Sequence, residues 1–136
     1  MTTLTDTKYF IVGAAWGGTE DCLDTFLKEG TWWCWGKDSK NNTDNNTGNS
    51  VENMKKRMLS IKAGDRLAVK KMHKGSQSII VKKLGIVKSV DFDVWRIYVD
   101  WLPLGELNRV VEFSAASSIH GGYSIDHPKI RDIFCI

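Results

Sequence analysis

The chain has 136 residues, of which 42% are hydrophobic and 26% charged, as expected for one globular domain rather than a disordered or membrane protein. No apolar run approaches the roughly 20 residues that cross a bilayer, and residues 1–6 are polar and unlike a secretory signal. We therefore expect a cytoplasmic protein without membrane contacts. The cysteines Cys22, Cys34 and Cys135 are scattered, which predicts reduced thiols rather than disulfides or a zinc site.

Positive charge is concentrated in one segment. The net charge is only +3, but residues 53–88 hold eleven of the 19 Lys and Arg and one of the 16 acids, Asp65. This asymmetry indicates a surface for a polyanion such as nucleic acid, and the alternative is a solvated lysine-rich face. The residues expected to contact a nucleic-acid backbone are Lys55, Lys56, Arg57, Lys70, Lys71, Lys82 and Lys83.

The first predicted elements are a strand and a helix. Residues 9–13 are aromatic and β-branched up to a glycine, which predicts a buried strand. A helix is expected over residues 19–29, with Thr19 as its cap and Glu20 and Asp21 in its first turn.

The next stretch alternates between extended, polar and helical patterns. Residues 31–35 predict a brief extended segment with three tryptophans. Residues 37–50 are polar and rich in asparagine, so we expect a flexible loop there. A second helix is expected over residues 51–61, with its methionines toward the core.

The second half of the chain predicts mainly strands. Residues 94–101 are the clearest, because apolar and polar side chains alternate, and Gly85 marks a candidate break in an earlier strand. Further strands are expected over residues 67–72, 78–90 and 110–113, and a closing helix over residues 127–134. This order predicts a single α+β domain over residues 1–136, with a curled mixed sheet of five or six strands, or a partly open barrel, and two or three packed helices.

Residues that could support catalysis are few. The histidines His73, His120 and His127 are far apart in the sequence, and no Ser or Cys has the context of a nucleophile. No pair of acids has a metal-ligand spacing, and no glycine-rich phosphate loop follows the first strand. We therefore expect no catalytic residue, no metal and no other cofactor, with the histidines in surface or loop positions.

Four of the six tryptophans lie within the first 35 residues. Neighbouring side chains of an extended segment point in opposite directions, so Trp32 with Cys34 and Trp33 with Trp35 cannot all enter one core. At least one face of the segment must lie elsewhere, where its rings could stack on a base or line a base pocket. The alternative is that these rings are core residues.

The order of several short motifs resembles a known family. They are YFIV at 9–12, WGG at 16–18, FLKEGTW at 26–32, IKAGDRLAVK at 61–70, GIV at 85–87 and VDW at 99–101. Together they span roughly residues 8–115 and resemble the EVE-like domain found in front of AAA+ ATPases in McrB-type restriction systems. They are more distantly similar to the EVE and YTH domains of the PUA-like superfamily.

The resemblance implies a PUA-like fold and a reader that draws a modified base into a pocket with aromatic walls. Trp32 matches the first tryptophan of that pocket, Asp100 belongs to the matching aspartate–tryptophan pair, and residues 13–16 match the segment across the base. The base-binding residues expected on this ground are Trp16, Trp32, Cys34, Asp100, Ala14 and Ala15.

Three functions remain open. The first is a nucleic-acid-binding reader in a restriction or defence setting, with DNA favoured over RNA. The second is a non-catalytic interaction module of the same fold, a partner of a nuclease or an AAA+ ATPase. The third is an enzyme acting on nucleic acid or nucleotides. Salt-dependent binding of oligonucleotides distinguishes the first from the second.

Overall fold

The computed structural model describes residues 7–13, 15–16, 20–21, 23–32, 56–73, 77–93, 96–103, 107–113 and 119–134. The strands in this part are β1 (Tyr9–Gly13), β2 (Ala15–Trp16), β3 (Glu20–Asp21), β4 (Thr31–Trp32), β5 (Arg66–His73), β6 (Ser78–Asp91), β7 (Arg96–Trp101), β8 (Arg109–Val111) and β9 (Ile119–Tyr123). The helices are α1 (Leu23–Glu29) and α3 (Pro128–Phe134), and residues 56–59 form a helical turn. The expected loop over residues 37–50 lies outside the described residues.

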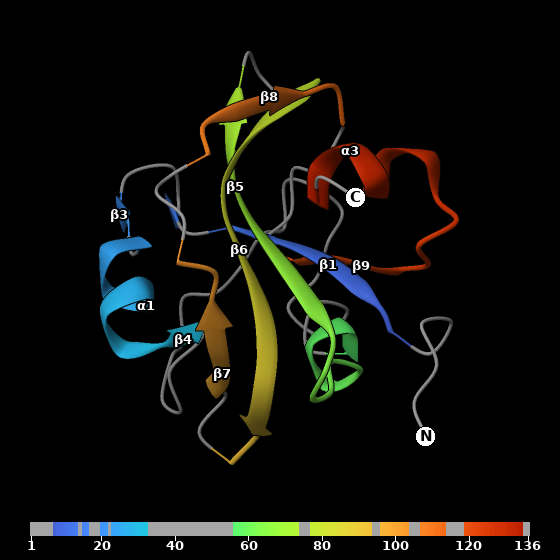
Figure 1. Ribbon diagram of the computed structural model, residues 1–136. Helices are drawn as coiled ribbons and strands as arrows, with labels where there is room; N and C mark the ends of the chain where they lie inside the picture. The colour runs from blue at the N-terminus through green and yellow to red at the C-terminus, as the bar shows by residue number, and fades with distance from the viewer. Residues whose placement is uncertain are drawn as a thin grey trace.

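The main sheet is mixed and has seven strands. Six of them follow the order β4-β7-β6-β5-β1-β9, and β8 pairs with β6. The β1–β5 pair is parallel, whereas the other pairs of this sheet are antiparallel. Figure 1 shows β5 and β6 as two long, twisted strands at the centre, with α1 and α3 on opposite sides of them. The predicted α+β class with a curled mixed sheet is confirmed, but the sheet has seven strands rather than the five or six expected.

One face of the sheet encloses a core that we call the inner core. It contains Trp32 from the β4 edge and Ile119 from the β9 edge, so the sheet curls enough to bring side chains from both edges into one cluster. Leu23 and Phe26 of α1 and Met58 of the helical turn pack on this face. Apolar burial of this kind supplies most of the stabilisation of a domain.

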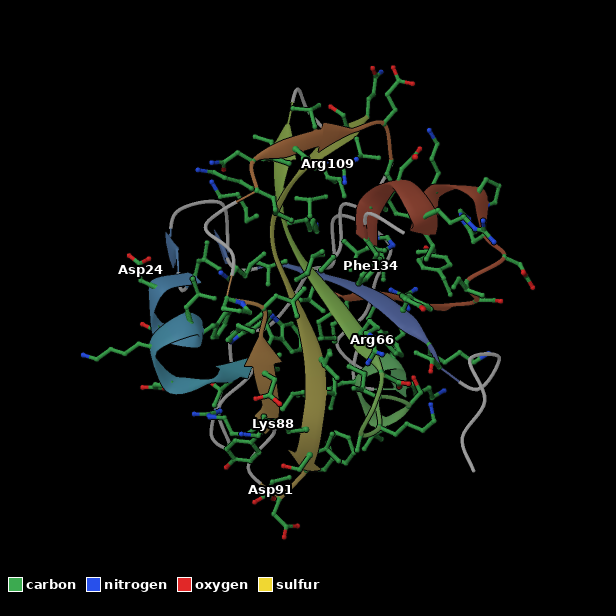
Figure 2. All side chains as sticks on the ribbon, viewed as in Figure 1. Asp24, Arg66, Lys88, Asp91, Arg109 and Phe134 are labelled. Atoms are coloured by element: carbon green, nitrogen blue, oxygen red, sulfur yellow. The ribbon has the colours of Figure 1, made fainter. Side chains whose placement is uncertain are left out.

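The opposite face forms a second, outer core. Ile130, Ile133 and Phe134 of α3 pack there against side chains of β1, β5 and β6. The rings of Tyr9 and Phe134 meet edge to face with centroids 5.0 Å apart, and Figure 2 shows Phe134 between α3 and the sheet. The spacing of apolar residues that predicted the closing helix therefore corresponds to a buried helix face.

Asp65 fixes the start of the parallel strand pair. Its carboxylate is fully buried and accepts hydrogen bonds from the backbone N–H groups of Lys8 and Lys62, each at 3.0 Å, and from Lys62 Nζ at 2.6 Å. Its carbonyl also accepts from the N–H of Val87 at 2.8 Å. Because these donors come from three separate segments, Asp65 ties the beginning of β5 to β1 and β6.

The helix expected over residues 19–29 needs correction. It begins at Leu23, because Glu20 and Asp21 form β3 and pair with Trp16 and Ala15 of β2. Backbone pairing with β2 has outweighed the acidic residues that favour a first helical turn. Of the helix expected over residues 51–61, residues 56–59 are helical and residues 51–55 lie outside the described part.

Strand β6 is continuous through Gly85, where a break was a candidate. A Cβ at this position would lie 2.5 Å from Val99 Cγ1 and 2.7 Å from Trp101 Cε3. The glycine is therefore required by the close approach of side chains from β7 rather than by a bend in the strand. Strand β9 was not predicted from the sequence, and its pairing with β1 decides its conformation. Among the described residues, no helix is long and apolar enough to cross a membrane.

Candidate nucleic-acid interface

Trp32 is a core residue. Its side chain has 0% exposed surface, its ring packs 6.4 Å from that of Phe26, and its Nε1–H donates to the carbonyl of Gly13 at 2.9 Å. Its position on β4 pairs it with Ile97 of β7, which is also in the inner core. A base pocket needs an exposed ring face, so the expectation that Trp32 walls such a pocket is corrected by its burial.

Asp100 lies on the other side of the sheet from Trp32. Side chains alternate along β7, where Ile97 and Val99 are buried in the inner core and Asp100 is exposed. Its carboxylate lies 3.7 Å from Lys88 Nζ, with both side chains open to solvent. Trp32 and Asp100 therefore do not meet in one pocket.

The other four expected pocket residues lie wholly or partly outside the described part of the chain. The backbones of Ala15 and Trp16 form β2, but their side chains lie outside the described part, as do Ala14 and Cys34. Lys55, which is expected to contact a nucleic-acid backbone, also lies outside the described part.

The structure describes the other six cations expected to contact a nucleic-acid backbone, and they differ in burial. Lys70 and Lys83 have only 5% and 9% of their surface exposed, which corrects their placement on an open basic surface. Figure 2 shows Lys88, on β6, and Arg109, on β8, near opposite ends of the sheet. The better exposed members of the expected set are Lys56 and Lys71, which are exposed, and Arg57 and Lys82, which are half-buried.

The register of β5 and β6, with a bulge in β6, gives the directions of the two buried lysines. Val69 of β5 pairs with Lys83, but the next residue, Lys70, pairs with Val81, so Lys82 is the extra residue of the bulge. Lys83 is thereby on the inner-core side with Val69, and Lys70 is on the outer-core side with Val81. The bulge thus decides the direction of Lys83, whereas alternation along β5 after Val69 decides that of Lys70.

Four half-buried rings form an aromatic cluster that was not predicted: Phe113, His120, Tyr123 and His127. The centroid of Phe113 lies 6.5 Å from that of His120, 5.8 Å from that of Tyr123 and 6.2 Å from that of His127. Tyr123 and His127 are 5.0 Å apart. His120 and His127, which are far apart in the sequence, thus belong to one cluster through Phe113. No sequence signal identified this cluster, because its rings come from segments that only β9 and the start of α3 bring together.

Positive charge surrounds one ring of the aromatic cluster. Burial, then the charges of Lys70 and Arg57, lower the pKa of His120 from 6.5 to about 4, so its imidazole is neutral at neutral pH. Burial raises the pKa of Tyr123, and the charge of Arg57 opposes this. Arg57 Nη1 donates to the carbonyl of Ile119 at 3.0 Å, at the edge strand β9.

The described residues contain no group of three or more His, Cys, Asp or Glu that could hold a metal ion. No protein-family model matches the sequence, and no curated protein matches it.

Proposed function

We propose that this chain is a nucleic-acid-binding domain that contacts the phosphate backbone with cations of residues 53–88, not through a base pocket at Trp32. The observation that carries the proposal is that the carboxylate of Asp65 is buried and hydrogen-bonded. Asp65 is the only acid in the segment, it is fully buried, and its carboxylate is bonded to Lys62 and to backbone N–H groups. The segment therefore presents no carboxylate of its own to solvent.

The cations that support the proposal are Lys56, Arg57, Lys71 and Lys82, which we call the basic set. All four are exposed or half-buried, and a long ammonium or guanidinium side chain at a surface can reach a phosphate while its stem packs on the protein. If each neutralises one phosphate of a single strand, the logarithm of the affinity should fall with that of the salt concentration with a slope of about −3. Lys88 is left out of the set because Asp100 lies beside it.

The proposal also includes the fold family of the chain. We infer a PUA-like domain of the EVE type, supported by the order of the motifs and by a mixed sheet that curls around one core. The parallel β1–β5 pair at its centre joins two of those motifs, at residues 9–12 and 61–70.

The test is fluorescence anisotropy with labelled single-stranded DNA, duplex DNA and RNA over a range of salt concentrations. The wild-type protein should bind with an affinity that falls steeply as salt rises. Lys71→Glu should weaken binding to all sequences alike and reduce the salt slope by about 1 or more. Lys28→Glu is the matched control, because Lys28 is also exposed but lies in the last turn of α1, outside the segment.

Two results would contradict the proposal. One is the absence of binding to every oligonucleotide at low salt. The other is an equal loss of affinity in the Lys71 and Lys28 variants, which would indicate a general effect of net charge rather than contacts made by the basic set. A salt-insensitive complex with a protein partner would instead favour the interaction-module alternative.

A further inference from the structure

Strand β8 is an open edge of the main sheet. Figure 1 shows it at the end of the molecule near the turn between β5 and β6. Among the described strands, β8 has β6 on one side and no neighbour on the other. A strand in this position turns unpaired backbone groups outward, and these groups can pair with a further strand.

The two other edges of the sheet are protected. Strand β4 has only two residues. Strand β9 is bulged against β1, and Arg57 Nη1 donates to the carbonyl of Ile119 on it. Short length, bulges and covering side chains are means by which proteins prevent sheet edges from pairing. Strand β8 pairs with β6 without a bulge, and two of its three residues are valines.

The middle residue of β8 is an exposed apolar side chain. Val111 is in the outer core, so Val110 points to the opposite face of the sheet. Its side chain is 55% exposed, more than any other large hydrophobic residue in the described part of the chain. The charge of the neighbouring Arg109 lies on the other face, because its Nη1 donates to the carbonyl of Asp132 in α3 at 2.6 Å. Val110 is therefore left without a charged side chain to guard it on its own face.

A row of side chains leads across the sheet to Val110. Val110 pairs with Ile80 of β6, and Ile80 pairs with Lys71 of β5. Ile80 is half-buried and Lys71 is exposed. The row is thus apolar at the open edge and charged behind it, which suits a partner strand that is also apolar at this position.

We propose that β8 pairs with β8 of a second copy of this chain, antiparallel and about a two-fold axis at Val110, so that two sheets become one. The inference goes beyond the proposed function and does not depend on it. A two-fold interface brings the same patch of both copies together. Val110 then lies beside Val110 of the other copy, and the joined row is apolar in its middle with Lys71 at each end.

The charges near β8 are complementary in this arrangement. Continued by one residue at each end, the pairing sets Glu112 opposite Asn108 of the second copy. Lys82 Nζ donates to Asn108 Oδ1 at 2.5 Å, so the exposed carboxylate of Glu112 comes beside an ammonium group, twice by symmetry. Arg109 faces Val111, and no like charges of β8 stand directly opposite. This self-complementarity favours a second copy over a strand of another protein.

Sedimentation equilibrium of the full chain, purified free of nucleic acid, measures the dimer. A single strand pair buries little surface, so we expect a weak dimer that forms as the protein concentration rises. Val110→Arg should raise the dissociation constant at least about tenfold, because two guanidinium groups would meet at the axis. Leu59→Arg is the matched control and should change it less than about twofold. Leu59 is 51% exposed and lies in the helical turn over residues 56–59, outside β8.

A charge exchange tests the register of the pairing. Glu112→Lys should weaken the dimer about threefold or more, because it brings two ammonium groups together. Adding Lys82→Glu to that variant should restore the dissociation constant to within about twofold of the wild type, since the pair of opposite charges returns with its partners exchanged. Thermal unfolding of each variant separates loss of pairing from loss of folding. If the double variant does not fold, the comparison of Val110→Arg with Leu59→Arg decides alone.

Four results would overturn the proposal. The first is a wild-type protein that stays monomeric at every concentration, and the second is a Val110→Arg variant that dimerises as well as Leu59→Arg. The third is a folded double variant that dimerises no better than Glu112→Lys. The fourth is a dimer that forms only when an oligonucleotide is present, because the nucleic acid would then join the copies. Each of these results leaves the proposed function standing, since a monomer can bind nucleic acid.

Discussion

Replacing Trp32 tests whether this ring is a core residue or a surface for a base. The side chain is fully buried in the inner core, so Trp32→Ala should destabilise the protein by about 3–5 kcal/mol through the cavity it leaves. The carbonyl of Gly13 would also lose its indole donor, which adds about 1 kcal/mol. Trp32→Phe keeps a ring and removes the donor, and we expect a loss of about 1–3 kcal/mol.

Urea unfolding followed by circular dichroism measures these losses. With a slope of about 2 kcal/mol per molar urea, a loss of about 4 kcal/mol lowers the midpoint by about 2 M. Oligonucleotide affinity of Trp32→Phe, measured where the variant is folded, should stay within about twofold of the wild type, because a fully buried ring makes no contact with a base.

A matched control is Trp101→Phe. Trp101 is only partly buried against the inner core and its Nε1–H donates to the carbonyl of Phe26 at 2.9 Å. The control therefore removes the same kind of hydrogen bond and should cost less than Trp32→Phe. A Trp32→Ala variant that keeps its urea midpoint but loses about tenfold or more in oligonucleotide affinity would refute the core assignment and restore the base pocket.

Three further predictions concern stability. Asp65→Asn should cost about 2–3 kcal/mol in urea unfolding, because the amide keeps only one acceptor oxygen, turns an NH2 group toward a donor and loses the charge that pairs with Lys62; an unchanged midpoint would contradict this role. Gly85→Ala should cost about 1–3 kcal/mol, because the new Cβ meets the ring of Trp101 at 2.7 Å; a thermal midpoint equal to that of the wild type would show that the two strands separate at no cost. The third prediction follows from the low pKa of His120, since the unfolded chain binds a proton before the folded one does as the pH falls. The free energy of unfolding should therefore decline between pH 6.5 and about 4 and level off below. Solvent screening of this partly exposed ring limits the loss to about 1–2 kcal/mol. His120→Gln should remove that part of the pH dependence, and an unaltered profile would contradict it.

The local elements were largely determined by the sequence itself. Alternation of apolar and polar residues predicted β7, in which Ile97 and Val99 are buried while Tyr98 and Asp100 are exposed. The apolar spacing near the C-terminus predicted α3 and its buried Ile130. These predictions succeed because one face of each element is buried, and burial imposes the periodicity of the element on its sequence.

The composition of the candidate site was decided by the tertiary structure. Strand β9 contains two glycines and a histidine, a pattern that does not predict a strand, and it is extended because it pairs with β1. The bulge at Lys82 decided on which face of the sheet Lys83 lies, and the aromatic cluster joins residues that no spacing relates.

The base pocket expected at Trp32 is a second feature that the sequence alone could not decide. The sequence established that neighbouring side chains of residues 31–35 point in opposite directions, but it could not establish which face enters the core. Pairing of Trp32 with Ile97 placed that ring in the inner core, and alternation along β7 then placed Asp100 on the opposite face. Strand register is set by the whole sheet rather than by any one strand, so only the tertiary structure could separate these two residues and bring Arg57, Lys70 and His120 together.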